Sequence, residues 1–132
     1  GQTDKIGRPY ITHPRRVAFA VRKLAPENMR VEAQIVALLH DTVEDTGVTL
    51  DYLARYFSVS IVDAVDALTK RKGETLEQSI ARVRANELAR LVKHADIADN
   101  TDPERTALLD EETRERLAKK YAKSLTLLSL GE

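Results

Sequence analysis

The sequence predicts an all-α fold, and three observations carry that prediction. Apolar residues recur at helical spacing through most of the 132 residues. The sequence contains no sustained alternation of apolar and polar residues and no Asn-Gly hairpin turn, so it gives no indication of strands. Aromatic residues make up only 5%, which disfavours a core built on a sheet. With 42% hydrophobic residues, we expect one compact multi-helix bundle over residues 1–132.

The first half of the chain is expected to form four short helices after an opening loop punctuated by Gly7 and Pro9. Pro14 suits the first turn of a helix, where its missing N–H costs nothing. Thr49 is expected to cap the third helix, and Ser58 or Ser60 to start the fourth. The apolar stripes of the four helices lie within 17–24, 31–39, 50–54 and 61–68.

The second half is expected to form two longer helices. A basic loop at 70–73 precedes Thr75, which is predicted to open one helix that runs to about Asn100 and ends before Pro103. The last helix is predicted at about 111–128. We find no internal repeat or linker.

Composition excludes several classes of protein. Lys plus Arg and Asp plus Glu both number 21, so the net charge is zero and no basic excess predicts a nucleic-acid partner. There is no Cys for a disulfide framework, and no apolar run approaches the roughly 20 residues that span a bilayer. We therefore expect a soluble cytoplasmic protein without a membrane partner. The oligomeric state stays open, with a homodimer as one alternative.

The strongest chemical signal is the abrupt polar end of the second helix. After the apolar residues 37–39 the chain reads His40-Asp41, followed one turn later by Glu44-Asp45. An imidazole beside a carboxylate is a ligand pair for a first-row divalent metal ion, and two further carboxylates can position a water molecule. For the Glu44–Asp45 pair, a solvated acidic cluster is the alternative.

Two other candidates have weaker local support. His13 lies at a loop-to-helix junction, where a histidine is more often a cap or a surface residue. Asp96 follows no inward-facing pattern, and spacing alone favours an exposed helical carboxylate there.

Three blocks in order give these residues a family context. They read Tyr-Ile-x-His-Pro at 10–14, Leu-His-Asp-x-x-Glu-Asp-Thr at 39–46, and Lys-x-Ala-Asp-x-x-x-Asn at 93–100. Together they resemble the HD superfamily of metal-dependent phosphohydrolases, and within it the RelA/SpoT-type and small alarmone hydrolases that degrade (p)ppGpp. The resemblance implies an HD-domain helical bundle and hydrolysis of a 3′-pyrophosphate.

The resemblance also implies roles for individual residues. His13, His40, Asp41 and Asp96 match the family's metal ligands, with Mn²⁺ as the implied ion and other first-row divalent metals as alternatives. Glu44 and Asp45 match the pair that activates or positions the nucleophilic water. The candidates for binding the nucleotide substrate are Lys5, Tyr10, Lys70 and Asn100; for Lys70 a solvated loop is the alternative, and Tyr10 is also suited to packing on the first helix.

The chain departs from the family's pattern in and around the nucleotide pocket. Asp4 stands where the alarmone hydrolases usually carry Arg, and an acid there would repel a polyphosphate. Asp99 stands where their last block usually has His, and a family Thr falls at Pro103. The chain opens on Gly1 rather than Met, and we expect it to lack the family's additional N-terminal helix upstream of residue 1.

These departures leave three functions to separate. The first is (p)ppGpp 3′-pyrophosphohydrolysis. The second is hydrolysis of another nucleotide or small phosphate ester. The third is a helical regulatory module that keeps the metal site without turnover.

Overall fold

The chain folds into helices of four to 18 residues packed around one central helix. The structure is a computed structural model, and it describes residues 12–41, 43 and 46–130. Helices and connecting turns account for all of this described part, which contains no strand, so the predicted all-α class is confirmed. The elements in chain order are α1 (Thr12–Leu24), η1 (Glu27–Met29), α2 (Arg30–Leu39), α4 (Leu50–Ala54), α5 (Val59–Leu68), α6 (Leu76–Arg84), α7 (Glu87–Asn100), α8 (Pro103–Thr106) and α9 (Glu111–Leu128).

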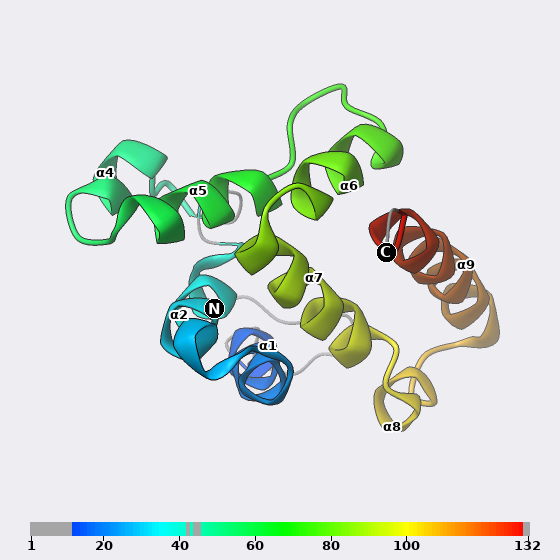
Figure 1. The fold of residues 1–132 in the computed structure, drawn as a ribbon. Helices are drawn as coiled ribbons and strands as arrows, with labels where there is room; N and C mark the ends of the chain where they lie inside the picture. The colour runs from blue at the N-terminus through cyan, green and yellow to red at the C-terminus, as the bar shows by residue number, and fades with distance from the viewer. Residues whose placement is uncertain (1–11, 42, 44–45, 131–132) are drawn as a thin grey trace.

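The central helix is α7, which contacts α1, α2, α5, α6 and α9. Figure 1 shows α1 and α2 on one side of α7 and α9 on the other. Its fully buried side chains include Ala89, Val92 and Ala95, whose small size allows neighbouring helices to approach closely. A residue on α7 can therefore meet residues from both ends of the sequence.

Side-chain caps set the start of most helices. Thr49 accepts a hydrogen bond from the backbone N–H of Tyr52, and Ser58 accepts one from Ile61, as predicted for the third and fourth helices. Thr75 and Gln78 form a reciprocal capping box at the start of α6.

The predicted single helix from Thr75 to Asn100 was wrong, because the structure divides it into α6 and α7. Asn86 adopts an extended conformation (φ −117°, ψ 117°) and its side chain accepts a hydrogen bond from Ala89 N–H. This cap stops α6 and starts α7 in a new direction, so that α6 packs against α9 while α7 enters the core. The break needs neither Gly nor Pro, and this is why it was missed.

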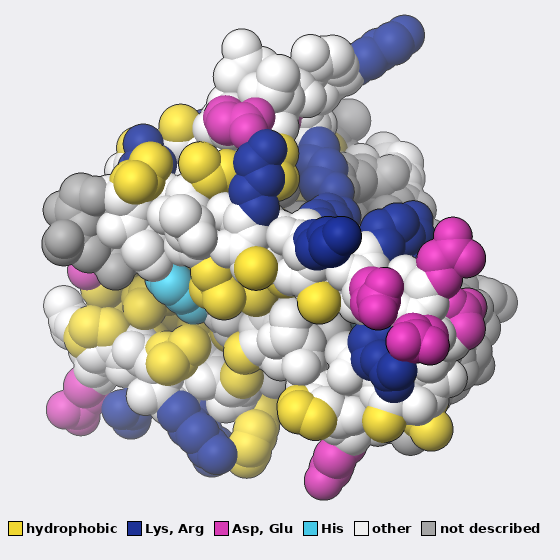
Figure 2. All heavy atoms as spheres, turned by 90° about the vertical axis from the view of Figure 1, so that its right-hand side faces the viewer, with side chains coloured by type: hydrophobic (Ala, Val, Ile, Leu, Met, Phe, Trp, Pro, Cys, Tyr) yellow, Lys and Arg dark blue, Asp and Glu magenta, His cyan; other side chains and the backbone are white. Residues whose placement is uncertain are grey.

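No helix in the part of the chain that the structure describes combines the length and the apolar character needed to cross a bilayer. On the side of the molecule that carries α9, hydrophobic side chains alternate with basic and acidic ones (Figure 2).

Candidate metal centre

The first candidate ligand, His13, lies in the first turn of α1 with its side chain buried. Its two ring nitrogens face two carboxylates of α7. Nε2 is 2.8 Å from Asp96 Oδ1, and Nδ1 is 2.6 Å from Asp99 Oδ2. His13 is thus neither a helix cap nor a surface residue, which were the local alternatives.

The His-Asp pair lies where α2 ends. His40 is buried, and its Nδ1 donates a 2.5 Å hydrogen bond to the carbonyl of Ala37 in the last turn of α2. This bond turns Nε2 toward the carboxylates, 3.2 Å from Asp41 Oδ2 and 3.5 Å from Asp96 Oδ1. The Asp41 side chain keeps 27% exposure, so it lies at the mouth of the cluster.

Asp96 of α7 is the carboxylate at the centre of the cluster. Its Oδ1 faces His13 and also accepts a 3.3 Å hydrogen bond from the amide of Asn100. Its Oδ2 is 3.6 Å from the Lys93 ammonium group. Asp96 is buried, so the expectation from spacing of an exposed carboxylate was wrong, and the inward placement implied by the resemblance is what the structure has.

The donor atoms present suit a divalent metal ion. Among the described residues, one nitrogen or oxygen from each of His13, His40 and Asp96 lies within 4.8 Å of the other two. Ligand atoms that share a first-row ion at roughly 2.1 Å are about 3 Å apart, close to the separations seen here. His40 Nε2 is buried without a hydrogen-bond partner in the described structure. An orphaned imidazole nitrogen aimed at carboxylates is what a metal ligand requires.

The electrostatics show how strongly the cluster attracts positive charge. Burial opposes the charged form of His13, but hydrogen bonds to Asp96 and Asp99 outweigh it and raise the pKa from 6.5 to about 9. The pKa of His40 is raised in the same balance between burial and Asp96. Burial also opposes the charge of Asp96, yet both imidazoles hold its pKa well below the usual range. The buried negative charge of the cluster thus favours cations.

Helix α9 covers one side of this cluster through Tyr121. The Tyr121 side chain is buried, and burial together with the negative charges of Asp96 and Asp41 raises its pKa to about 12. The phenol therefore stays neutral next to the acids.

Sequence reasoning missed the second carboxylate of α7 and its two arginines. Asp99 accepts a 2.8 Å hydrogen bond from Arg16 Nε, and Arg105 Nε donates to its backbone carbonyl at 3.1 Å. Arg105 is half-buried. The available signal was spacing, because His13–Arg16 and Asp96–Asp99 are each one helical turn apart.

The remaining predicted residues divide into two groups. Asn100 lies within the cluster through its bond to Asp96, and Lys70 is exposed on the loop after α5. Their predicted contacts with substrate stay predictions. Lys5, Tyr10, Glu44 and Asp45 lie outside the described residues.

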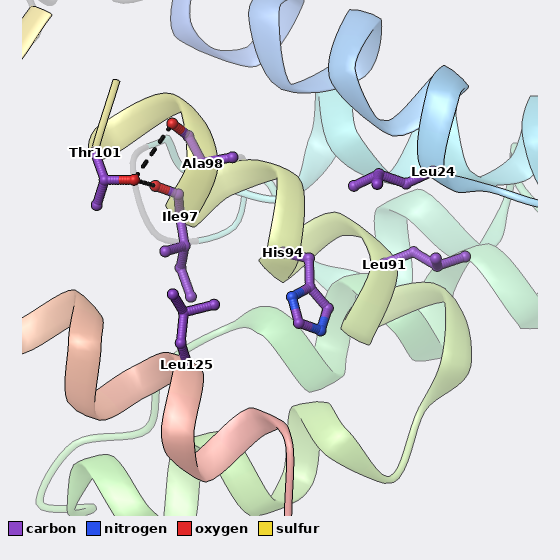
Figure 3. Close-up of a pocket in the computed structure, with 7 residues that line it drawn as sticks. All are labelled: Leu24, Leu91, His94, Ile97, Ala98, Thr101 and Leu125. Atoms are coloured by element: carbon purple, nitrogen blue, oxygen red, sulfur yellow. Dashed lines mark hydrogen bonds between the residues drawn. The ribbon is translucent and has the colours of Figure 1, made fainter. Parts of the chain in front are cut away.

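The opposite side of α7 carries an apolar groove instead of a charge cluster. Its volume is about 540 Å³, and its lining residues are Leu24, Leu91, His94, Ile97, Ala98, Thr101 and Leu125. Figure 3 shows His94 pointing from α7 into the space between α1 and α9, while Thr101 donates its hydroxyl to the carbonyl of Ile97. This third histidine is thus separate from the metal cluster.

Comparison with known proteins gives the fold a family. The family model described as "HD domain" matches residues 10–104. A probable GTP pyrophosphokinase of Mycobacterium leprae is 35% identical over 89% of this chain and 16% of its own length. A guanosine-3′,5′-bis(diphosphate) 3′-pyrophosphohydrolase of Aquifex aeolicus is 33% identical over 89% of this chain and 17% of its own. The bifunctional (p)ppGpp synthase/hydrolase SpoT of Escherichia coli is 40% identical over 53% of this chain and 10% of its own.

The chain spans less than a fifth of the length of these relatives, whose names include both a pyrophosphokinase and a pyrophosphohydrolase. The family assignment is independent of that difference, since the matched segment extends from before His13 to beyond Asn100 and contains the whole described cluster. The chain belongs to the HD-domain family.

Proposed function

We propose that this protein is a metal-dependent phosphohydrolase that removes the 3′-pyrophosphate from guanosine tetra- or pentaphosphate. The observation that carries the proposal is the convergence of His13, His40 and Asp96 around an orphaned imidazole nitrogen. Such a centre can activate a water molecule for hydrolysis, and a relative that covers 89% of this chain is named as a 3′-pyrophosphohydrolase.

In this proposal His13, His40, Asp41 and Asp96 hold the ion, with Mn²⁺ expected and other first-row divalent ions as substitutes. When bound, such an ion lowers the pKa of a coordinated water molecule and polarises a phosphoryl oxygen. Asp41, at the mouth of the cluster, lies where a ligand can meet solvent and substrate. The buried Asp96 keeps its negative charge and provides the fixed anionic end of the site.

Glu44 and Asp45 orient the nucleophilic water and accept its proton in this proposal. The water oxygen attacks the phosphorus nearest the ribose, the bond from that phosphorus to the 3′ oxygen breaks, and the 3′ oxygen takes up a proton. The products are pyrophosphate and guanosine 5′-diphosphate or 5′-triphosphate. The cations Lys5 and Lys70 contact the phosphates, while Tyr10 and Asn100 contact the nucleoside.

The test is release of pyrophosphate from ppGpp by the protein fully loaded with Mn²⁺. Asp41→Ala should abolish it, because Asp41 is a ligand in the proposal. Asp63→Ala removes an exposed carboxylate from α5 and should leave turnover unchanged. Absence of product from the loaded wild-type protein contradicts the proposal, and binding of ppGpp without product would favour the regulatory module.

A second candidate keeps the reaction and changes the substrate to another nucleotide or small phosphate ester. The altered last block supports it. Near the cluster, Arg105 Nε donates a hydrogen bond to the Asp99 carbonyl and lies 3.8 Å from Asp99 Oδ2. Their charges are thereby withdrawn from contacts with a nucleotide. Assaying a panel of phosphorylated metabolites beside ppGpp separates the two, and faster hydrolysis of a simple monophosphate would select the second.

A further inference from the structure

Asp99, which is not one of the proposed metal ligands, forms a close contact with the ligand His13. It occupies a position where the chain departs from the family's pattern, and it binds the ring nitrogen of His13 that faces away from the candidate metal site. Nδ1 of His13 is 2.6 Å from Asp99 Oδ2, while Nε2 faces Asp96. One imidazole is thus held at both nitrogens by carboxylates one turn apart on α7.

The Asp99 carboxylate is fixed in turn by two arginines. Arg16 Nε donates to Oδ1 at 2.8 Å, and Arg105 Nε lies 3.8 Å from Oδ2. The Asp99 side chain is only 6% exposed, so its orientation depends on these partners rather than on water. A buried carboxylate with a guanidinium on one oxygen and an imidazole N–H on the other has little freedom to rotate.

The four groups form two matched pairs on two helices. Helix α1 supplies His13 and Arg16, and α7 supplies Asp96 and Asp99, with each pair one turn apart. Docking of α1 on α7 therefore aligns the ligand pair, His13 with Asp96, next to the supporting pair, Arg16 with Asp99.

We propose that Asp99 is a positioning residue that keeps the proton of His13 on Nδ1 and so presents Nε2 to a divalent metal ion, with Arg16 orienting its carboxylate. A histidine that ligates through one nitrogen needs its other N–H bound, because this fixes the tautomer and the ring orientation. The inference rests on the metal centre of the proposed function, but it assigns a role to two residues outside the ligand set.

The experiment measures Mn²⁺ and Zn²⁺ affinity by calorimetry for the whole chain and for three variants. Asp99→Ala should weaken binding by roughly 10–100-fold, and Asp99→Asn, which keeps an acceptor oxygen, should lie between it and the wild type. Arg16→Gln should weaken binding less than Asp99→Ala. Asp66→Asn, which removes a 43% exposed carboxylate paired with Arg71, is the matched control and should bind like the wild type.

A second readout separates positioning from mere stabilisation. In the protein loaded with diamagnetic Zn²⁺, nitrogen NMR should find His13 protonated at Nδ1 in the wild type, and Asp99→Ala should lose this single state. The variants' thermal unfolding gives the folded fraction, so affinity is compared per folded molecule.

The outcomes distinguish this inference from the proposed function. If Asp99→Ala binds metal as tightly as the wild type while Asp96→Ala does not, the metal centre stands and the positioning role is overturned. If the wild-type chain binds neither ion, the metal centre itself is wrong, and the inference falls with it.

Discussion

Two clusters of charged residues in this protein use similar side chains for different ends. The metal cluster joins His13, His40, Asp96 and Asp99, and the loop cluster joins Asp66, Arg71, Glu74 and Arg82 where α5 leads into α6. In the loop cluster, Arg82 donates to both Glu74 oxygens (2.5 and 3.0 Å) and to the carbonyls of Ala67 and Thr69 (3.0 and 2.9 Å). Two of these hydrogen bonds hold the end of α5, and the other two hold Glu74 in the following loop.

The metal cluster has an excess of acceptors and an imidazole nitrogen, His40 Nε2, without a hydrogen-bond partner in the described part. A structural cluster satisfies its own members, whereas a site for a ligand keeps some of its capacity for that ligand. The two clusters teach that burial and short distances alone do not identify a functional site. A functional site is identified by polar atoms, such as His40 Nε2, that remain available to a ligand.

The largest expected effect comes from removing the central carboxylate. Asp96→Ala should weaken metal binding on the order of 1,000-fold, about 4 kcal/mol, because it deletes a ligand and unpairs both histidines. Calorimetry with Mn²⁺ measures this. Glu74→Gln changes the acid of the loop cluster and should leave metal affinity unchanged. Equal losses in both variants would erase the distinction between the clusters.

The next effect is a dependence of stability on pH in the metal-free protein. The pKa of His13 is about 9 in the folded chain and 6.5 when unperturbed, so its protonated form stabilises the fold fully below pH 6.5. That contribution, on the order of 3 kcal/mol, is lost as pH rises through about 9. The raised pKa of His40 acts in the same direction.

Urea unfolding in a chelator at pH 6 to 10 measures this loss, and His13→Gln should reduce the slope of the profile. The loop cluster should contribute nothing there, because Arg82 holds the pKa of Glu74 at about 2 and the pKa of Arg82 is raised in return. An undiminished slope in His13→Gln would place its origin elsewhere.

A smaller effect is expected from Arg82→Gln. It should lower the free energy of unfolding by about 1–3 kcal/mol, since Glu74 and the carbonyls of Ala67 and Thr69 lose their donor. Metal affinity should stay within about twofold of wild type. Chemical denaturation and calorimetry on the same preparation give both values, and a large change in affinity would show that the clusters are coupled.

The smallest effect is expected at the exposed edge of the loop cluster. Asp66 and Arg71 form an ion pair at 2.6 Å with side chains 43% and 39% exposed. Asp66→Asn should cost about 0.2–1 kcal/mol, because such pairs are screened by solvent. A chemical melt at low and at high salt measures it, and a cost unaffected by salt would contradict an electrostatic origin.

The sequence predicted the helices better than it predicted the site. Apolar spacing located α1, α2, α5 and α9, because each presents one stripe to the core. It missed the stop at Asn86, since a side-chain cap leaves the apolar period on either side intact. Periodicity reports which face is buried, and it does not report a change of axis.

At the site, local pattern pointed to His40 and Asp41, whose polarity ends an apolar run. Asp96 needed the family resemblance, because an inward carboxylate on a central helix has no signature of its own. Asp99 entered only as a departure from the family's pattern, and neither route joined it to Arg16. Their contacts join α1 to α7, and helix docking at this distance in sequence is a property of the folded chain.

Because the proposed ligands are far apart along the chain, binding of a metal ion would depend on folding of the whole domain. His13 and Asp96 are 83 positions apart, and they meet only after α1 has docked on α7. An ion that binds the assembled pair binds the native state alone, so mass action converts metal concentration into global stability. At a free metal concentration 100 times Kd, the gain is about 2.7 kcal/mol. If the proposed metal binds, its supply would thereby raise the population of the folded state.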